Sequence, residues 1–265
     1  MPRPPTNEPA GTENANRFLP ELGTYPVFPP VFPPLTQAWP RHSEAPGLLA
    51  IGGDLSVARL SEAYRQGIFP WYSAGQPILW WSPDPRMVLS TAHFKWHRSL
   101  RKTVDRFLLS GQGEVRFDGA FERVIRSCAQ APREGQNGTW ISEDMIQAYM
   151  ALHRAGVAHS VETWWQGELV AGLYLVNLGR AVFGESMFTR VTDGSKIALS
   201  ALVAFCRHQQ IERIDCQQHT RHLASLGAAE IPRDEFNAWL EKATPLPAPV
   251  WQFDESDWHA LNSKP

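Results

Sequence analysis

The sequence lacks the signatures by which several common enzyme classes are identified. It has no GxGxxG or GxxxxGK[ST] loop for a nucleotide phosphate, no GxSxG nucleophile turn and no HExxH zinc pair. Its three cysteines, Cys128, Cys206 and Cys216, show no CxxC spacing, so neither a disulfide framework nor a zinc site is indicated. These absences weigh against a kinase, a dehydrogenase, a serine hydrolase and a zinc protease.

Signals for export and for membrane insertion are also missing. The N-terminal segment MPRPPTNEPAGTENANRF has no apolar signal region, and no apolar run approaches the roughly 20 residues that span a bilayer. The formal net charge is −2, so any contact with RNA requires a local basic patch. We expect a cytoplasmic protein that makes no membrane contact.

Proline and tryptophan are abundant, by contrast. Prolines crowd the first part of the chain, where they oppose helix and central strand. We predict a disordered Pro-rich tail over residues 1–20, a small N-terminal α/β domain over 21–85, a larger domain over 86–250 and a loose C-terminal tail over 251–265. The eleven Trp indicate either a substantial core or stacking surfaces for flat ligands.

Apolar periodicity predicts an α+β fold. A helix capped by Ser56 runs to Gln66 and stops at Gly67. In the larger domain, helical stripes lie at Leu100–Leu108, Phe121–Cys128 with Asp118 as the cap, Met145–Met150 with Ser142 as the cap, Asp193–His208 and Asp234–Ala243. Alternating strands predict an antiparallel meander at His159–Trp165, Leu169–Val176 and Arg180–Glu185, followed by a strand at Arg213–Gln217. Such an order is typical of an α+β domain.

One candidate site lies on the last predicted strand. Strand alternation places Asp215 and Gln217 on one face and Cys216 on the other. An acid beside an amide can orient an attacking amine, although a solvated strand edge explains the same pattern. Cys216 is predicted to be a buried apolar residue, because no activating base is evident nearby.

Glu185 is a second candidate, since it follows a glycine at the end of an apolar strand. A buried carboxylate requires a partner. That partner is either an incoming ammonium group or a nearby cation such as Arg190 or Lys196.

Aromatic and basic residues suggest contacts with RNA. Trp71 and Trp140 occur in turn-like sequence and can stack an unpaired base, whereas Trp80 and Trp81 are better explained as core residues. Arg98, Arg101 and Lys102 share one helix face, which either binds phosphates or is simply solvated.

Several motifs in consistent order resemble one family. They are Gly47-Leu-Leu-Ala-Ile-Gly-Gly-Asp54, Ala63-Tyr64-Arg-Gln-Gly67-Ile-Phe-Pro-Trp71, Pro77-Ile-Leu-Trp-Trp81-Ser-Pro-Asp-Pro-Arg86, Gly138-Thr-Trp140, Gly184-Glu185-Ser-Met-Phe188, Ile214-Asp215-Cys-Gln217 and Ala224-Ser-Leu-Gly227. From about residue 45 to about residue 240, the chain is similar to bacterial leucyl/phenylalanyl-tRNA–protein transferases.

The resemblance implies a larger domain with a GNAT-like (acetyltransferase-like) fold and a central, mostly antiparallel sheet flanked by helices. It implies transfer of Leu or Phe, less readily Met, from aminoacyl-tRNA to proteins that begin with Arg or Lys, which marks them for degradation under the N-end rule. No metal, ATP or coenzyme A is expected, and we expect a monomer.

The resemblance also assigns roles to residues. Gln217 is expected to accept a hydrogen bond from the acceptor's α-amino group, with Asp215 polarising it. Glu185 matches a polar active-site residue. Trp71 and Trp140 match aromatics that hold the terminal adenosine, with Tyr64 in the same region. Further assignments are an apolar side-chain pocket at Leu173, Val182, Leu199 and Leu202, and tRNA-stem contacts at Arg98, Arg101 and Lys102. In place of the Met and Phe expected in well-known members, this chain has Leu173 and Val182.

Two other interpretations remain open. An acetyl-CoA-dependent N-acyltransferase on the same fold requires a glycine-rich pyrophosphate loop, and the segment Arg190-Val-Thr-Asp-Gly194-Ser supplies one glycine. A non-catalytic tRNA- or degron-binding module keeps the aromatic and basic residues but does not require the Asp215/Gln217 pair.

Overall fold

The computed structural model describes residues 20–23, 31–131 and 140–262. Except for Pro20, the predicted tail over residues 1–20 lies outside these ranges. The N-terminal part forms a four-stranded sheet in the order β1-β2-β4-β3. Its strands are β1 (Glu21–Leu22), β2 (Leu48–Gly52), β4 (Leu79–Trp81) and β3 (Phe69–Pro70), with the 3-10 helix η1 (Leu35–Gln37) and the helix α2 (Val57–Arg65) alongside.

The predicted start and stop of α2 are confirmed. The Ser56 hydroxyl accepts the backbone N–H of Arg59, which satisfies one of the donors that every helix start leaves open. Gly67 follows the helix with φ +72, a conformation that side chains other than glycine rarely adopt.

The larger part is built on a seven-stranded sheet, in the order β11-β5-β10-β9-β8-β7-β6. All neighbours pair antiparallel except β9 and β10, which run parallel. The predicted meander is confirmed as β7–β9, and the α+β class with a mostly antiparallel sheet is confirmed with it. The strands are β5 (Arg86–Ser90), β6 (Gly113–Phe117), β7 (Ala158–Trp165), β8 (Glu168–Leu178), β9 (Ala181–Thr189), β10 (Arg213–Gln217) and β11 (Ala229–Ile231).

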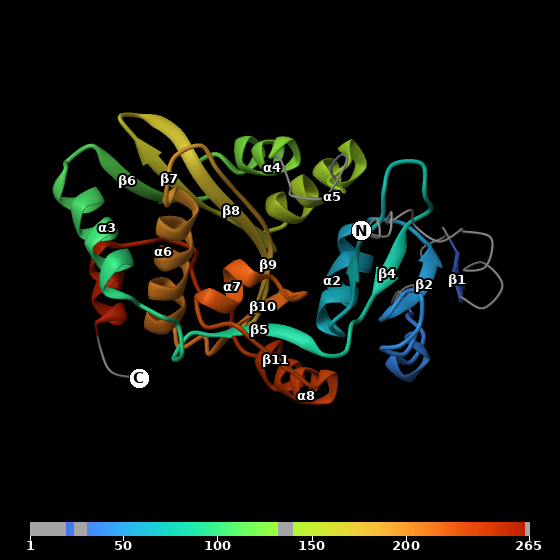
Figure 1. Cartoon of the computed structure of the whole chain (residues 1–265). Coiled ribbons are helices and arrows are strands. Elements are labelled where there is room, and N and C mark those ends of the chain that lie inside the picture. Colours follow the sequence, from blue (N-terminus) through green and yellow to red (C-terminus); the bar gives the residue numbers. More distant parts are fainter. Residues whose placement is uncertain (1–19, 24–30, 132–139, 263–265) are drawn as a thin grey trace, which may run out of the picture.

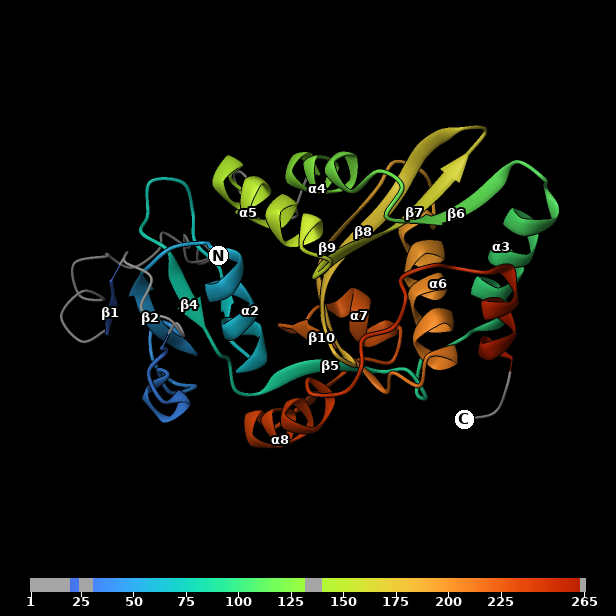
Figure 2. The same cartoon turned by 180° about the vertical axis from the view of Figure 1, so that it is seen from behind.

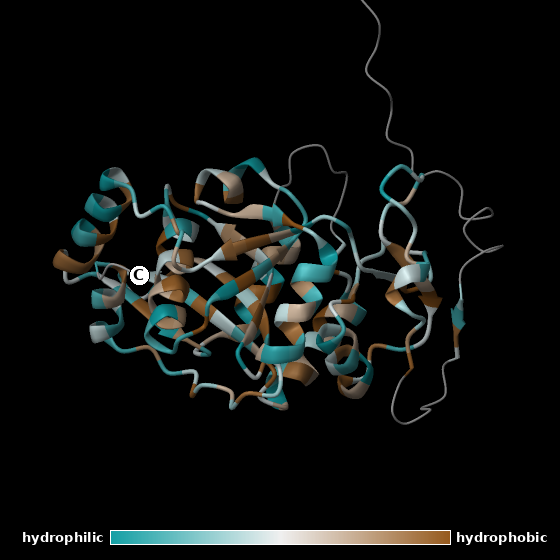
Figure 3. Cartoon of the chain, turned by 90° about the horizontal axis from the view of Figure 1, so that it is seen from below, coloured by the Kyte–Doolittle hydropathy of each residue, from teal (hydrophilic) through white to brown (hydrophobic). Residues whose placement is uncertain are grey.

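Helices cover both faces of this sheet (Figures 1 and 2). One layer contains α4 (Phe121–Gln130) and α5 (Glu143–Arg154), and the other contains α6 (Gly194–His208) and α3 (Arg98–Leu109). Because side chains alternate along a strand, Tyr174 and Val176 of β8 enter the core beneath α4 and α5, while Leu173 and Leu175 enter the core beneath α6. Two further helices, α7 (Arg221–Ser225) and α8 (Arg233–Ala243), flank the β10 end. Hydrophobic residues concentrate on the central strands and inner helix faces (Figure 3).

Two predictions about local structure are wrong. The C-terminal residues up to Asn262 are not loose, because the 3-10 helix η2 (Glu255–Leu261) packs against α6 and buries Trp258. Asp118 does not cap α4, whose N-cap is Ala120. The Asp118 carboxylate instead accepts the backbone N–H of Ser160 and bonds the His159 ring. Within the described part of the chain, no helix is long and apolar enough to cross a membrane.

Candidate active site

The site lies where β9 and β10 separate. The two strands pair only through Val182 with Ile214 and Phe183 with Asp215. Just beyond, each strand carries a register shift against its other neighbour. On β9 the shift leaves Glu185 without a partner in the β8 register, and on β10 it leaves Cys216 without one in the β5 register. Such bulges redirect side chains and are frequent beside active sites.

A cavity of about 420 Å³ opens at this separation. Most of its lining residues fall into three groups. Aromatic rings come from Phe69, Trp71, Trp140 and Tyr174, apolar side chains from Leu173, Met187, Leu199, Leu202, Ile214 and Leu223, and polar groups from Glu185, Ser186, Gln217, Gln218, Thr220 and His222. A largely apolar cavity with few convergent polar groups is the usual form of a small-ligand site.

Most of the predicted substrate residues meet in this cavity. Trp71, Trp140, Glu185, Gln217, Leu173, Leu199 and Leu202 all line it. Val182 does not line it but packs in the core beneath α6, so its place in the side-chain pocket is a wrong prediction. Ile214, which pairs with Val182 across the strands, lines the cavity instead. Tyr64 is also fully buried and absent from the lining.

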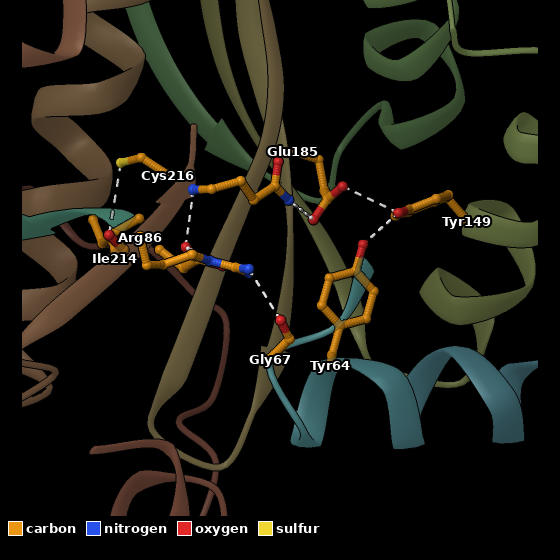
Figure 4. A network of polar contacts seen from close by, with 9 residues as sticks. Tyr64, Gly67, Arg86, Tyr149, Glu185, Ile214 and Cys216 are labelled. Carbon is orange, nitrogen blue, oxygen red and sulfur yellow. Dashed lines mark hydrogen bonds and ion pairs between the residues drawn. The ribbon is translucent and has the colours of Figure 1, made fainter. Parts of the chain in front are cut away.

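Glu185 and Gln217 are joined directly. The side-chain Nε2 of Gln217 donates to Oε1 of Glu185 at 2.9 Å, and the Tyr149 hydroxyl donates to Oε2 at 3.0 Å. The Tyr64 hydroxyl contacts that of Tyr149, so a chain of polar groups runs from α2 through α5 to the cavity (Figure 4). Both alternatives for a cationic partner fail, since Arg190 bonds Leu169 and Ser127, and Lys196 bonds Asp193.

This environment makes Glu185 a weak acid. Burial raises the pKa of the Glu185 carboxyl to about 7, and the nearby Asp215 charge adds to the rise. Hydrogen bonds from Tyr64 and Tyr149 and the more distant Arg86 charge oppose it. Burial also raises the pKa of both tyrosines well above their ordinary value, so their hydroxyls stay protonated. The carboxyl therefore exchanges its proton near neutral pH, as an acid–base group requires.

Asp215 has a different environment. It is fully buried, and its carboxylate accepts two hydrogen bonds from Arg86, from Nε at 2.8 Å and from Nη2 at 2.6 Å. The predicted alternation of faces is wrong here, because Gln217 has a left-handed φ of +61 and the strand is bulged. Cys216 and Gln217 consequently both line the cavity, whereas Asp215 does not.

The remaining predicted residues lie outside the cavity lining. Arg98, Arg101 and Lys102 are exposed on α3, and Arg101 lies 4.0 Å from Asp105. Trp80 is fully buried, as predicted for a core residue. Trp81 packs edge-on against Trp71 and donates its indole N–H to the Trp71 carbonyl, which supports one aromatic wall of the cavity.

Sequence reasoning missed three residues of the site. Tyr149 was assigned only to an apolar helix stripe, and Arg86 only to the start of a domain. Cys216 was expected to point away from Gln217, but burial raises the pKa of its thiol and keeps it protonated beside the cavity. An Arg that opens an apolar strand is a usable signal, since a buried guanidinium requires a buried acid.

No cluster of His, Cys, Asp and Glu able to hold a metal ion occurs among the residues that the structure describes. The cavity presents a carboxyl near its titration point, an amide carbonyl and a large apolar surface. An ester with an apolar side chain and an amine nucleophile fit these groups, because aminolysis of an activated ester needs mainly positioning and proton transfer.

A carboxyl that titrates near neutral pH, beside an amide and a largely apolar cavity, suits a group-transfer enzyme of the acyltransferase class. More narrowly, the chain belongs to the leucyl/phenylalanyl-tRNA–protein transferase family. The model of that family matches residues 88–241, and the model of its N-terminal domain matches residues 53–84. The enzyme is therefore an aminoacyltransferase that acts on proteins.

Similar sequences carry the same name. A leucyl/phenylalanyl-tRNA–protein transferase of a Polaromonas species is 63% identical over 230 residues, which cover 87% of this chain and 90% of the relative. One from Leptothrix cholodnii is 61% identical over 234 residues, which cover 88% of this chain and 91% of the relative.

Solved structures are much more distant. L-PGS from Bacillus licheniformis has a TM-score of 0.38 at 14% identity, covering 78% of this chain and 66% of that one. A GCN5-related N-acetyltransferase-like protein from Streptococcus suis has a TM-score of 0.32 at 14% identity, covering 66% of this chain and 64% of that one.

Proposed function

We propose that the enzyme transfers Leu or Phe, and less readily Met, from aminoacyl-tRNA to the α-amino group of proteins that begin with Arg or Lys. The product is an N-terminal degradation signal. It acts in the cytoplasm as a monomer and uses no metal or organic cofactor. The observation that carries this proposal is the convergence of Trp71, Trp140, Glu185 and Gln217 on one cavity with an apolar lining.

The donor binds through its two flat or apolar parts. Leu173, Leu199 and Leu202 receive the aminoacyl side chain, and burial of a Leu or Phe side chain contributes roughly 1.5–3 kcal/mol. Trp71 and Trp140 stack the terminal adenosine, where each stacked ring is worth roughly 1–3 kcal/mol. Tyr64 acts from behind the cavity through its contact with Tyr149.

The acceptor amine attacks beside Gln217. Because the Gln217 amide nitrogen donates to Glu185, its carbonyl oxygen is available to accept an N–H of the amine. Glu185 takes the proton that the ammonium group loses. The nitrogen forms the new bond to the carbonyl carbon, and the ester C–O bond breaks. The proton that the attacking nitrogen then loses passes to the departing ribose oxygen, while Glu185 releases the first proton to solvent.

The tRNA body contacts the exposed cations of α3. Arg98, Arg101 and Lys102 bind stem phosphates in this proposal, which supplies affinity without sequence reading. None of the three lines the cavity, which fits a tRNA whose 3′ end alone enters the site.

Transfer of labelled leucine from Leu-tRNA to peptides tests the proposal. Label should reach peptides that begin with Arg or Lys, should not reach a matched peptide that begins with Gly, and should disappear after RNase pretreatment of the tRNA. Binding of charged tRNA without any transfer contradicts the proposal and supports a non-catalytic binding module.

Trp140→Ala separates donor binding from chemistry. It should raise the KM for Leu-tRNA about tenfold, since stacking is lost, and leave the KM for the peptide unchanged. Trp239→Ala is a matched control, because Trp239 packs on Phe236 outside the cavity lining. Equal effects of the two substitutions contradict a stacking role for Trp140.

A further inference from the structure

Arg86 joins three parts of the molecule beneath the cavity. Its guanidinium lies 4.9 Å from the centre of the Phe69 ring of β3 and 4.6 Å from that of Phe236 of α8. Nη1 donates to the Gly67 carbonyl, just after α2, at 3.0 Å (Figure 4). The remaining donors, Nε and Nη2, bind Asp215. With only 1% of its surface exposed, Arg86 is held in one orientation by all of these contacts.

The Asp215 carboxylate that binds Arg86 also contacts the backbone of Gln217. Oδ1 of Asp215 accepts the backbone N–H of Gln217 at 2.9 Å. The side-chain amide of Gln217, in contrast, donates to Glu185. Among the described contacts, Asp215 therefore holds the Gln217 main chain, and Glu185 is the carboxylate that polarises its amide.

The Gln217 main chain needs such a restraint. Its φ of +61 lies in the left-handed region, which residues other than Gly, Asn and Asp rarely adopt. This conformation occurs at the register shift of β10 against β5, directly after Cys216, which has no partner in that register. An oriented, buried hydrogen-bond acceptor directly beneath the Gln217 N–H can enforce it.

We propose that Arg86 is a positioning residue of the transfer reaction, which acts through Asp215 to hold Gln217 in the left-handed conformation that presents its amide to the acceptor amine. This inference rests on the proposed function. It assigns Asp215 to the positioning of the Gln217 backbone rather than to polarisation of the amide.

Single-residue variants of the full chain test this assignment. Arg86→Gln removes the charge, whereas Arg86→Lys keeps the charge but cannot make the bidentate hydrogen bond to Asp215. The matched control is Arg59→Gln, because Arg59 is also buried, also pairs with an aspartate, Asp54, and lies outside the cavity lining. The assay is leucine transfer from Leu-tRNA to an Arg-starting peptide, at a temperature at which thermal melts show every variant folded.

A positioning role predicts a change in kcat rather than in KM. Arg86→Gln should lower kcat about ten- to a hundredfold, since displacement of a reacting group by about an ångström has effects of that size. The KM for Leu-tRNA should stay within about threefold, because the donor walls are intact, and Arg86→Lys should recover part of kcat. The pH midpoint of Arg86→Lys should stay at the wild-type value, because the charge is kept, whereas that of Arg86→Gln should rise, because the Arg86 charge that lowers the pKa of Glu185 is lost. Arg59→Gln should lower the melting temperature and leave kcat unchanged.

Several results overturn the inference. One is a wild-type kcat in folded Arg86→Gln or Arg86→Lys. Another is an equal loss of kcat in Arg59→Gln, which indicates that loss of any buried ion pair disturbs the fold. A third is a displaced pH midpoint in Arg86→Lys, because it shows that the Arg86–Asp215 pair takes part in proton transfer. If Arg86→Gln does not fold, Arg86→Lys carries the test alone. Absence of transfer by the wild type refutes the proposed function instead, and so the two failures are distinguishable.

Discussion

Two carboxylates meet Gln217 from different sides, and their surroundings differ in charge. Asp215, on the sheet side, has no exposed surface and binds a guanidinium through both oxygens. Glu185, on the cavity side, is held by a tyrosine hydroxyl and by the Gln217 amide, which are neutral groups. The same chemical group therefore occupies a charge-compensated environment in one place and an uncompensated one in the other.

One site can hold a permanently charged carboxylate and a carboxyl that exchanges its proton. A buried ion pair is destabilising to break by roughly 3–5 kcal/mol, so Asp215 suits a permanent structural contact. Burial without a contacting cation raises the pKa of Glu185 to about 7, which allows it to gain and lose a proton under working conditions. Gln217 lies between the two, since its backbone N–H binds Asp215 and its side-chain amide binds Glu185.

The largest expected effect comes from breaking the ion pair between Asp215 and Arg86. Asp215→Asn should lower the free energy of unfolding by about 3–5 kcal/mol, because Arg86 then remains buried without a counter-charge. For a chain of this size that corresponds to a fall in melting temperature on the order of 10 °C, measured by thermal denaturation. Glu235→Gln, which breaks the exposed pair with Arg213 of the same strand, should cost under about 1 kcal/mol. Similar losses in the two variants contradict the comparison.

The next largest effect concerns the residue between the carboxylates. Gln217→Ala removes the amide that accepts the amine, so kcat should fall on the order of a hundredfold, the size found when one well-placed hydrogen-bonding group is lost from a transition state. Steady-state transfer at saturating tRNA and peptide measures it. Gln147→Ala, on the outer face of α5, should keep wild-type turnover. Near-wild-type turnover of Gln217→Ala eliminates its proposed role.

Much of the architecture was predictable because its determinants are local. The stop at Gly67, the Ser56 and Ser142 caps and the β7–β9 meander all follow from neighbouring residues. The short strands β5, β6 and β11 were not predicted as strands. β5, for example, pairs with residues more than 100 positions away in sequence, and no local pattern reports such pairing.

The residues of the site also fall into those that local sequence predicts and those that depend on distant pairing. Glu185 and Gln217 were identified from their motifs, and the structure brings them together. Arg86 was not identified as part of the site, because its partner Asp215 lies 129 residues further along the chain. The left-handed Gln217 was also unpredictable, since a bulge depends on the register of two distant strands. Alternation rules fail where non-local pairing overrides them.

Replacement of Glu185, the carboxyl without a contacting cation, should change the pH dependence of activity. In the wild type, kcat/KM should rise as pH increases through about 7, because the Glu185 carboxylate that accepts the proton forms over that interval. Glu185→Gln should lower kcat/KM about tenfold at pH 8 and remove this midpoint. Rates between pH 5.5 and 8.5, corrected for spontaneous ester hydrolysis, measure it. A midpoint that persists in Glu185→Gln shows that another group titrates.

The last expected effect is on stability, and it isolates the same carboxyl without substrates. Because the folded-state pKa of Glu185 is raised above the ordinary 4.5, the folded protein binds more protons than the unfolded chain between about pH 4.5 and 7. Its contribution to stability is therefore fully present below about pH 4.5 and is lost as pH rises to about 7. Glu185→Gln lacks this term. The difference in unfolding free energy between the variant and the wild type should thus shift in the variant's favour by roughly 2–3 kcal/mol from pH 4.5 to 8. Urea titrations at both pH values measure the shift, and a difference that does not change with pH contradicts an uncompensated environment for Glu185.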